Sequence, residues 1–257
     1  MKLKKNPDIK MRRTVSQGRV WLIREACGVN LERINKAIAS HKLNVAAGRG
    51  HCLKIDKKRR LTRFSENGFS CVVKEFVSRP WHPMVADRRS WRSALGMERR
   101  RLPAVTYLAW GRRRGASSYI LMEDLGERNV SNELAAALRE HDTKRFRDLL
   151  TAAGKRMGEM HRSGVYHRDL KTDNFMRVSA DSEPVELKLI DLDSVRFFRR
   201  LPARCVVNNL RQFAGTLPPA TASRQVLRGV AVYRRATGMS KPHIRRVLSR
   251  LQPRRLA

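Results

Sequence analysis

Short runs of apolar or alternating residues fill much of the first half of the chain. They lie at His51 to Ile55, Leu61 to Phe64 and Phe69 to Phe76, and runs of this length predict strands. Asn67-Gly68 separates the last two runs, and because both residues tolerate positive φ, the pair predicts a tight hairpin turn. We therefore expect a small antiparallel meander here.

Helical spacing surrounds this meander. Residues 21–47 carry apolar positions at roughly helical intervals, whereas residues 1–20 are polar and basic and are expected to be poorly ordered. Met84 to Arg101 reads as a helix that ends before Pro103. Two further strands follow, at Val105 to Trp110 and at Tyr119 to Met122.

The second half is mainly helical. Ser131 is placed to cap a helix that runs through Glu140. A strongly apolar stripe then predicts a buried helix, with apolar residues at Phe146, Leu149, Leu150, Ala153, Met157 and Met160. Gly164 is expected at its C-cap. Two short strands, Phe175 to Val178 and Leu187 to Ile190, precede a mostly helical remainder at 205–251.

Together these patterns predict an α+β fold with two lobes. Residues 1–47 form a basic, partly helical N-terminal extension. Residues 48–124 form a small N-lobe, an antiparallel sheet with one helix. Residues 125–257 form a mostly helical C-lobe that ends in a basic helix.

The charge of the chain is far from neutral. Lys and Arg number 56 against 23 Asp and Glu, a formal net charge of +33 over 257 residues. After Asp193 no acidic residue occurs, while 15 Lys and Arg do. An arginine-rich proteome accounts for part of this excess, but long basic stretches also indicate an anionic partner such as nucleic acid, a phospholipid surface or an anionic glycolipid.

Cysteine usage and hydropathy indicate the compartment. The four cysteines form no CxxC pair, which fits reduced thiols in the cytoplasm. No apolar run approaches the roughly 18 residues of a membrane span, and no apolar h-region follows the basic N-terminus. We expect a cytoplasmic protein.

The candidate chemistry lies in residues 167–174, His-Arg-Asp-Leu-Lys-Thr-Asp-Asn, and in Leu189-Ile190-Asp191-Leu192-Asp193. Phosphoryl transfer to a hydroxyl needs metal ligands, a cation for the phosphates and a carboxylate near the acceptor. Asp169 is the acceptor-side carboxylate, and Lys171 can offset charge on the γ-phosphate. Asn174 and Asp191 offer the oxygen ligands that Mg²⁺ prefers. The motif predicts an ATP-dependent kinase, with His167 and Arg168 holding the loop.

An ATP site requires further parts in the N-lobe. Lys74 lies inside an apolar strand, where a kinase needs a lysine for the α- and β-phosphates. Glu123, Asp124 and Leu125 follow an apolar run at the expected interlobe hinge, where their backbone would bind adenine. There is no GxGxxG; the tip of the first hairpin is Lys57-Lys58-Arg59-Arg60 instead. The inserted helix offers only Asp87 and Glu98 as acids to pair with Lys74.

From about residue 50 to 235 the chain resembles the bacterial lipopolysaccharide core kinases, which include Kdo and heptose kinases. Beside the two motifs above, the resemblance rests on four segments: 59–64, Val73-Lys74-Glu75, Arg89-Ser90-Trp91-Arg92 and 119–125. Asp193 also stands where protein kinases have the glycine of Asp-Phe-Gly, as in this family. One departure is Ser90, because family members often carry a glutamate just before the helix tryptophan.

The resemblance implies a kinase fold and phosphorylation of a sugar hydroxyl of the lipopolysaccharide inner core. It implies Lys74 as the ATP lysine, Asp169 as the catalytic base, and Asn174 with Asp191 as the metal ligands. ATP, Mg²⁺ and an anionic glycolipid are the expected partners. The resemblance also implies a cytoplasmic protein that is peripheral to the inner face of the inner membrane.

The C-terminal helix offers a way to reach an anionic membrane. Ile244, Val247, Leu248 and Leu251 share one face, with arginines elsewhere around the helix. Such a helix can lie on an anionic bilayer, or its apolar face can pack against the large lobe.

Two other functions remain open. The loop is as close to that of protein serine/threonine kinases as to that of sugar kinases. The charge of +33 and Ser90 favour a third reading, a nucleic-acid-binding or pseudokinase scaffold, although nucleic acid is the less favoured partner.

Overall fold

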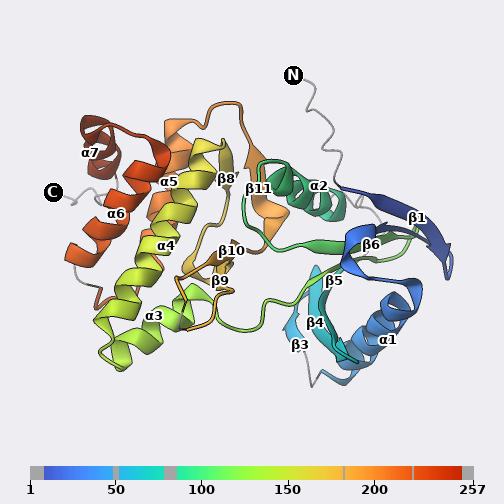
Figure 1. Ribbon diagram of the computed structural model, residues 1–257. Helices are drawn as coiled ribbons and strands as arrows, with labels where there is room; N and C mark the ends of the chain where they lie inside the picture. Colours follow the sequence, from blue (N-terminus) through green and yellow to red (C-terminus); the bar gives the residue numbers. More distant parts are fainter. Residues whose placement is uncertain (1–8, 49–51, 78–85, 182, 222, 251–257) are drawn as a thin grey trace. The chain divides into compact units, whose positions relative to one another are not determined.

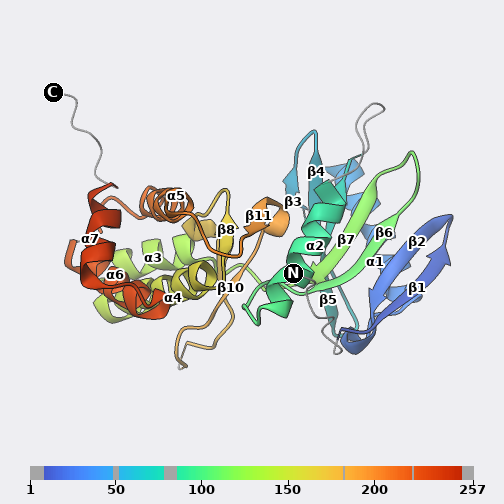
Figure 2. The same cartoon turned by 90° about the horizontal axis from the view of Figure 1, so that it is seen from above.

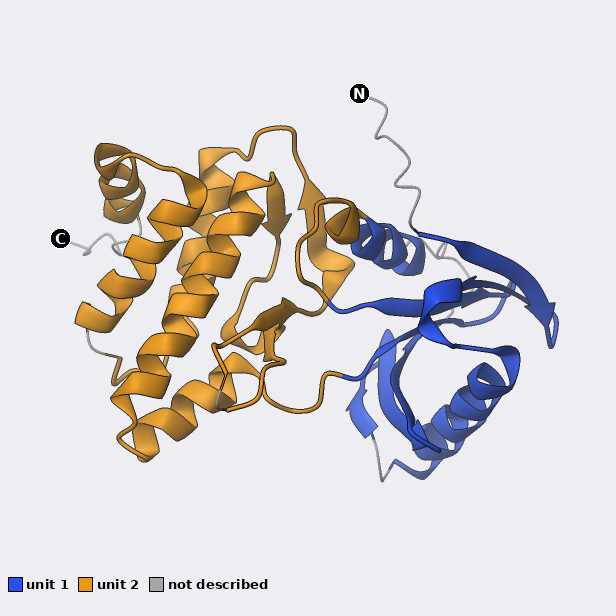
Figure 3. Cartoon of the chain, in the orientation of Figure 1, with its two compact units in different colours: residues 1–95, 105–124 blue, residues 96–104, 125–257 orange. Residues whose placement is uncertain are grey.

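The computed structural model describes residues 9–48, 52–77, 86–181, 183–221 and 223–250. His51, Met84, Val85 and Leu251, which the patterns assign to a strand and to helices, lie outside the described residues. The chain divides into two compact units, residues 1–95 with 105–124 and residues 96–104 with 125–257 (Figure 3). The first is built on a sheet and the second is mainly helical, which agrees with the predicted α+β, kinase-like fold.

The first unit is organised around a seven-stranded antiparallel sheet in the order β1-β2-β6-β7-β5-β4-β3 (Figure 1). Its strands are β1 (Met11–Ser16), β2 (Arg19–Arg24), β3 (Cys52–Ile55), β4 (Arg59–Glu66), β5 (Phe69–Phe76), β6 (Tyr107–Arg112) and β7 (Ser118–Glu123). The predicted meander is β3-β4-β5, and the N-terminal extension adds two strands beyond β6.

Two hairpin turns in this sheet use left-handed backbone. Asn67 and Gly68 have φ of 49° and 71° between β4 and β5, which confirms the predicted turn. Gln17 and Gly18 have φ of 50° and 66° between β1 and β2. The expectation that residues 1–20 are poorly ordered is therefore wrong for Met11–Ser16, which pairs with β2 along its whole length.

Helices cover opposite faces of this sheet (Figures 1 and 2). Helix α1 (Leu31–Ala47) begins after Asn30, whose side chain accepts a hydrogen bond from Arg33 N. Its apolar residues Ile34, Ala37 and Ile38 join a core with residues of five strands. The strand residues are Trp21, Ile23, Phe64, Cys71, Val73, Leu108, Ala109 and Leu121. Helix α2 (Ala86–Arg99) packs Trp91 against Trp110 and Tyr107 on the other face.

The second unit is dominated by helices. They are α3 (Val130–Arg139), α4 (Thr143–Arg162), α5 (Ala203–Ala214), α6 (Ser223–Thr237) and α7 (Lys241–Ser249). The predicted apolar stripe of α4 is buried throughout. Helices α4 and α6 lie side by side at glycines: a Cβ added at Gly154 would lie 2.5 Å from the carbonyl oxygen of Gly229.

Helix α3 begins two residues earlier than predicted. Asn129, rather than Ser131, is the N-cap of α3, and its side chain accepts a hydrogen bond from Asn132 N at 2.8 Å. Asp142 caps α4 in the same way, by accepting from Arg145 N.

Four short strands carry the loops of the motif. They form two antiparallel pairs, β8 (Val165–His167) with β11 (Val195–Phe197), and β9 (Phe175–Arg177) with β10 (Leu187–Leu189). The 3₁₀ helices Thr172–Asn174 and Leu192–Ser194 lie just before β9 and β11. Residues 167–174 and 189–193 thus belong to neighbouring strand ends within one unit.

The C-terminal helix packs within the second unit. Ile244 and Val247 of α7 are only 5% and 3% exposed, and Leu248 lines a cavity with residues of α4, α5 and α6. Its apolar side is therefore covered by protein, so the expectation that this face lies on a bilayer is wrong for the described residues.

The four cysteines are free thiols. Burial raises the pKa of the Cys71 thiol to about 12, which makes it inert at neutral pH. Among the described residues no helix combines the length and the apolar character needed to cross a bilayer.

Candidate active site

His167 joins the two parts of the motif. Its Nε2 donates to the carbonyl oxygen of Asp191 at 3.0 Å, and its Nδ1 accepts from Asp169 N at 3.3 Å. The side chain is fully buried, and burial lowers the pKa of the imidazole despite the favourable contacts with Asp191 and Asp169. The ring is therefore neutral and fixes the distance between two backbone segments.

Asp169 and Lys171 face each other at the surface of this unit. The Nζ of Lys171 lies 3.0 Å from the carboxylate of Asp169, and both side chains are about half exposed. A carboxylate in this state can approach a hydroxyl, and the ammonium beside it can stabilise negative charge on a transferred group.

Asn174 and Asp191 supply oxygen atoms on adjacent backbone. Asn174 Nδ2 donates to the carbonyl oxygen of Asp169 at 2.6 Å, and the carbonyl oxygen of Asn174 accepts from Ile190 N at 2.8 Å. Because the amide nitrogen is used, the amide oxygen points away from that carbonyl. Asp191 has left-handed backbone, with φ of 53° and ψ of 55°, a conformation with a steric cost for a residue that has a Cβ.

These two residues match the way Mg²⁺ is usually held. Among the described residues no cluster of three or more His, Cys, Asp or Glu forms a metal site. Mg²⁺ commonly binds one or two protein carboxylates together with substrate phosphates and water. One carboxylate and one amide oxygen fit that requirement.

Helix α5 holds the backbone of the loop through side chains that the motif does not reveal. The amide of Asn209 bonds both the N–H and the carbonyl oxygen of His167. Gln212 donates to the carbonyl of Arg168 and accepts from Leu170 N. Thr216, just beyond the C-terminal end of α5, accepts from Thr172 N at 3.1 Å.

Asn209 was missed by sequence reasoning, although one signal was available. It is fully buried in the apolar stripe of α5, beside Cys205, Val206 and Leu210. An amide within an apolar stripe needs a partner, because a buried polar group without one is unfavourable. The sequence cannot show that this partner is the loop 42 residues earlier.

Lys74 belongs to the first unit, where it is 3% exposed on β5. Its cross-strand neighbours are Leu61 and Ile120, and Ile120 in turn pairs with Trp110. Because Trp110 stacks on Trp91 of α2, Lys74 lies on the face of the sheet that α2 covers. Its ammonium is 5.4 Å from the centre of the Phe76 ring.

The first acid of α2 does not serve Lys74. Asp87 is fully buried and accepts from Trp110 Nε1 at 3.0 Å and from Arg112 Nε at 3.1 Å. Ser90, where the resemblance leads us to expect a glutamate, bonds the hydroxyl of Tyr107 at 2.8 Å.

The two acidic side chains of the predicted hinge bond other residues of the protein. Glu123 bonds Thr106 N at 2.6 Å, and Asp124 forms an ion pair with Arg63 at 2.8 Å. The boundary between the two units falls between Asp124 and Leu125. The binding of adenine by the backbone of residues 123–125 stays a prediction.

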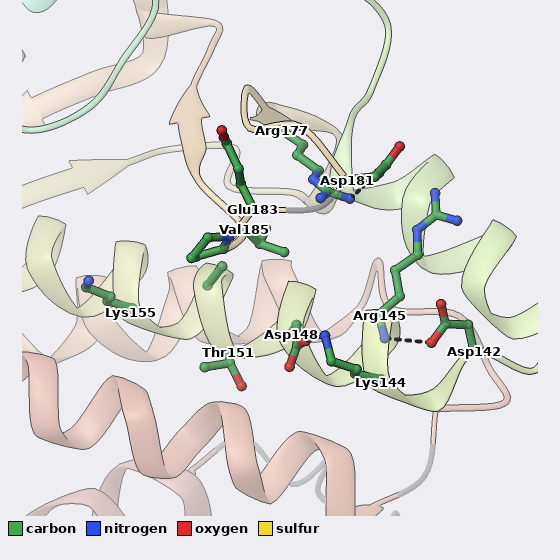
Figure 4. Close-up of a pocket in the computed structure, with 12 residues that line it drawn as sticks. Asp142, Lys144, Arg145, Asp148, Thr151, Lys155, Arg177, Asp181, Glu183 and Val185 are labelled. Atoms are coloured by element: carbon green, nitrogen blue, oxygen red, sulfur yellow. Dashed lines mark hydrogen bonds and ion pairs between the residues drawn. The ribbon is translucent and has the colours of Figure 1, made fainter.

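A separate groove of about 700 Å³ lies between the start of α4 and residues 177–185 (Figure 4). It contains none of the predicted site residues. Its basic residues are balanced by acids, and Arg177 is held by Glu133 and Asp181 at 3.3 and 2.9 Å. The groove therefore has little net charge to offer a ligand.

Kinase-fold phosphotransferases typically have two linked loops. One loop carries the carboxylate that orients the acceptor hydroxyl, and the other carries a carboxylate that binds the metal. Comparison with protein-family models gives the same class in more detail. The model of the lipopolysaccharide kinase (Kdo/WaaP) family matches residues 47–233, so the chain belongs to this family and its resemblance to these kinases is confirmed. The search of curated proteins gave no match.

The matched range leaves the N-terminal elements of the first unit outside it. Strands β1 and β2 and nearly all of helix α1 precede residue 47. They nevertheless contribute to the sheet and core of the first unit.

Proposed function

We propose that this protein is an ATP-dependent kinase that phosphorylates a sugar hydroxyl of the lipopolysaccharide inner core, at the cytoplasmic surface of the membrane. The observation that carries the proposal is the link through His167, which holds Asp169 and Asp191 in one rigid arrangement within a chain of this family. Such preorganisation is the main contribution of a protein to phosphoryl transfer.

In the proposed reaction, Asp169 orients the acceptor hydroxyl and takes its proton. The hydroxyl oxygen forms a bond to the γ-phosphorus while the bond between that phosphorus and the ADP oxygen breaks, so that ADP leaves. Lys171, 3.0 Å from Asp169, offsets the charge on the transferred group. General-base assistance of this kind contributes roughly 10²- to 10⁴-fold.

The remaining predicted residues bind the nucleotide and its metal. Asn174 and Asp191 would hold Mg²⁺, which supplies charge neutralisation at the phosphates. Lys74 would bind the α- and β-phosphates, and the backbone of residues 123–125 would bind adenine.

The charge of the chain supports an anionic acceptor. The net charge is +33, and the acid-free stretch after Asp193 includes much of the helical unit. A basic surface increases the local concentration of an anionic glycolipid and favours residence at an anionic membrane.

The test is phosphate transfer from ATP, with Mg²⁺, to isolated lipopolysaccharide core. We expect the acceptor to gain the mass of one phosphate with the wild type and not with Asp169→Asn. The matched control is Asp173→Asn, an exposed acid in the same loop, which should retain activity. In cells, unchanged core phosphate after deletion of the gene would contradict the proposal.

The sequence of the loop, His-Arg-Asp-Leu-Lys-Thr-Asp-Asn, supports a second candidate, a protein serine/threonine kinase. Transfer to protein hydroxyls, with none to the glycolipid, would favour it. If ATP turnover and the cellular phenotype both survive Asp169→Asn, the chain acts as a scaffold instead, and salt-sensitive binding to duplex DNA would then identify a nucleic-acid partner.

A further inference from the structure

A groove of about 480 Å³ lies on the sheet face shared by β1, β2 and β6, and its lining includes none of the predicted site residues. Its lining is Arg13, Val20, Leu22, Trp110, Arg112, Arg113 and Arg114. The strand register explains why they meet: Arg13 pairs with Leu22, Leu22 with Trp110, and Val20 with Arg112. All of these residues belong to the first unit.

The groove combines an apolar floor with a basic rim. Val20 is 37% exposed, and Val15, its partner on β1, is 65% exposed on the same face. Exposed valines on adjacent strands form an apolar surface that water solvates poorly. Helix α7 lacks such a surface, because Ile244 and Val247 are buried.

The four arginines of the rim provide positive charge. Arg112 is neutralised by the buried Asp87 at 3.1 Å. Arg13, Arg113 and Arg114 are exposed, and the described part of the chain gives them no acidic partner. Guanidinium groups match the oxygens of a phosphate in two-pronged hydrogen bonds, so this rim suits a phosphate group.

The geometry of Trp110 argues against single-stranded nucleic acid as the occupant. Its ring stacks on Trp91 with centroids 5.8 Å apart, and the Arg112 guanidinium lies 5.4 Å from its centre. The indole is therefore already engaged by protein groups, whereas binding of single strands relies on aromatic rings that accept bases. A phospholipid places a phosphate next to the apolar atoms of its glycerol region, so it matches a basic rim beside an apolar floor.

We propose that this groove, which we call the arginine groove, binds the headgroup of an anionic phospholipid and docks the protein on the bilayer. The inference rests on the proposed function, because it assigns the surface that brings the kinase to a membrane-held acceptor. The N-terminal hairpin, which precedes the residues matched by the family, supplies Arg13, Val20 and Leu22.

The test is flotation of the full-length protein with vesicles of phosphatidylcholine alone and of phosphatidylcholine with phosphatidylglycerol. We expect binding only to the anionic vesicles. The variant Arg13→Glu/Arg113→Glu/Arg114→Glu should bind on the order of a hundredfold more weakly, since each basic residue at an anionic surface contributes about fivefold. Val15→Ser/Val20→Ser should also weaken binding without changing charge.

The matched control is Arg245→Glu/Arg246→Glu/Arg250→Glu, which changes the same charge on exposed positions of α7. It should bind anionic vesicles much more tightly than the groove variant. Equal loss in the two variants, or undiminished binding of the groove variant, would overturn the inference. Inorganic phosphate that binds wild type in a thermal-shift assay, without any vesicle binding, would also overturn it.

Kinase activity separates this inference from the proposed function. On a water-soluble, deacylated acceptor, the groove variant should have wild-type kcat and KM, which also shows that it is folded. On acceptor in anionic vesicles its KM should rise. If the wild-type protein phosphorylates no glycolipid acceptor but still binds anionic vesicles through the arginine groove, the proposed function is refuted and the inference about the groove is supported.

Discussion

The imidazole of His167 spans the short distance from the catalytic loop to Asp191, with Nε2 3.0 Å from the carbonyl oxygen of Asp191. On its other side, Asn209 of α5 bonds both backbone polar groups of His167. The proposed base and the proposed metal ligand are thus positioned by a neutral, buried group. Rigid support of this kind is what a phosphoryl-transfer site requires.

The first prediction concerns this support. His167→Ala should lower kcat about 100-fold, because loss of the bridge lets the two loops shift relative to each other. The KM for ATP should change less, since Lys74 and the hinge are untouched. Steady-state kinetics measure both parameters.

Two further variants define the role of His167. His167→Gln, which restores a donor, should recover part of the kcat, and His243→Ala, an exposed histidine on α7, should be neutral. If His167→Ala lowers the melting temperature but leaves kcat unchanged in the folded protein, the residue is structural only.

The second prediction concerns the N-terminal extension. Ile34 of α1 is fully buried in the core under β5. Ile34→Ala should lower the free energy of unfolding by about 2–5 kcal/mol, through lost burial and the cavity left behind. Denaturant titration measures this free energy.

The control for this substitution lies on the same helix. Leu43 is 72% exposed, so Leu43→Ala should change stability by no more than about 0.5 kcal/mol. Similar stabilities for Ile34→Ala and Leu43→Ala would mean that the extension is an independent appendage rather than part of the fold.

Local signals explain which elements the sequence predicts well. Helix α4 follows from a stripe of apolar residues that continues for about four turns, from Phe146 to Met160. The β4–β5 turn follows from Asn67 and Gly68 alone. Residues 167–174 are contiguous, so their chemistry can be interpreted without knowing the fold. The α+β class and the kinase family were accessible for the same reason.

Non-local pairing explains what the sequence does not show. Strand β1 contains Arg12 and Arg13 and is half exposed, and its partner β2 joins the sheet only by pairing with β6, more than 80 residues later. Likewise, nothing in the pattern of α7 states whether Ile244 meets lipid or α5. The hydrogen bonds of Asn209 to the backbone of His167 cannot be predicted from the sequence, because they depend on how α5 packs against residues 167–174.

The third prediction uses the close contact between α4 and α6. A Cβ at Gly154 would lie 2.5 Å from the carbonyl oxygen of Gly229, whereas a Cβ at Gly229 would lie 3.4 Å from its nearest neighbour, the carbonyl oxygen of Leu150. Gly154→Ala should therefore destabilise the protein by roughly 1–3 kcal/mol through overpacking.

Gly229→Ala provides the control with the same chemical change. It should be neutral or stabilising by up to about 1 kcal/mol, because alanine is the better helix former. The two melting temperatures should therefore move in opposite directions or differ clearly. Equal shifts would show that α4 and α6 do not approach each other as closely as the structure indicates.

The last prediction is a pH dependence centred on His161. This residue of α4 is buried, with Nε2 3.2 Å from Asn209 Oδ1 and Nδ1 2.8 Å from the hydroxyl of Tyr233. Burial lowers the pKa of His161 from 6.5 to about 4, although the bond to Asn209 opposes this shift. Burial also raises the pKa of Tyr233, so that neither neighbour carries a charge in acid.

The sign of the effect follows from proton binding. Between pH 6.5 and about 4 the unfolded chain binds a proton at His161 and the folded chain does not, so the free energy of unfolding falls as the pH falls through this window. The contribution of His161 is fully lost below about pH 4 and amounts to roughly 3 kcal/mol. His161→Gln, which keeps a polar side chain but cannot titrate, should show a shallower decline over the same range. Parallel curves of unfolding free energy against pH for the two proteins would contradict the prediction, because groups shared by both cancel in the difference.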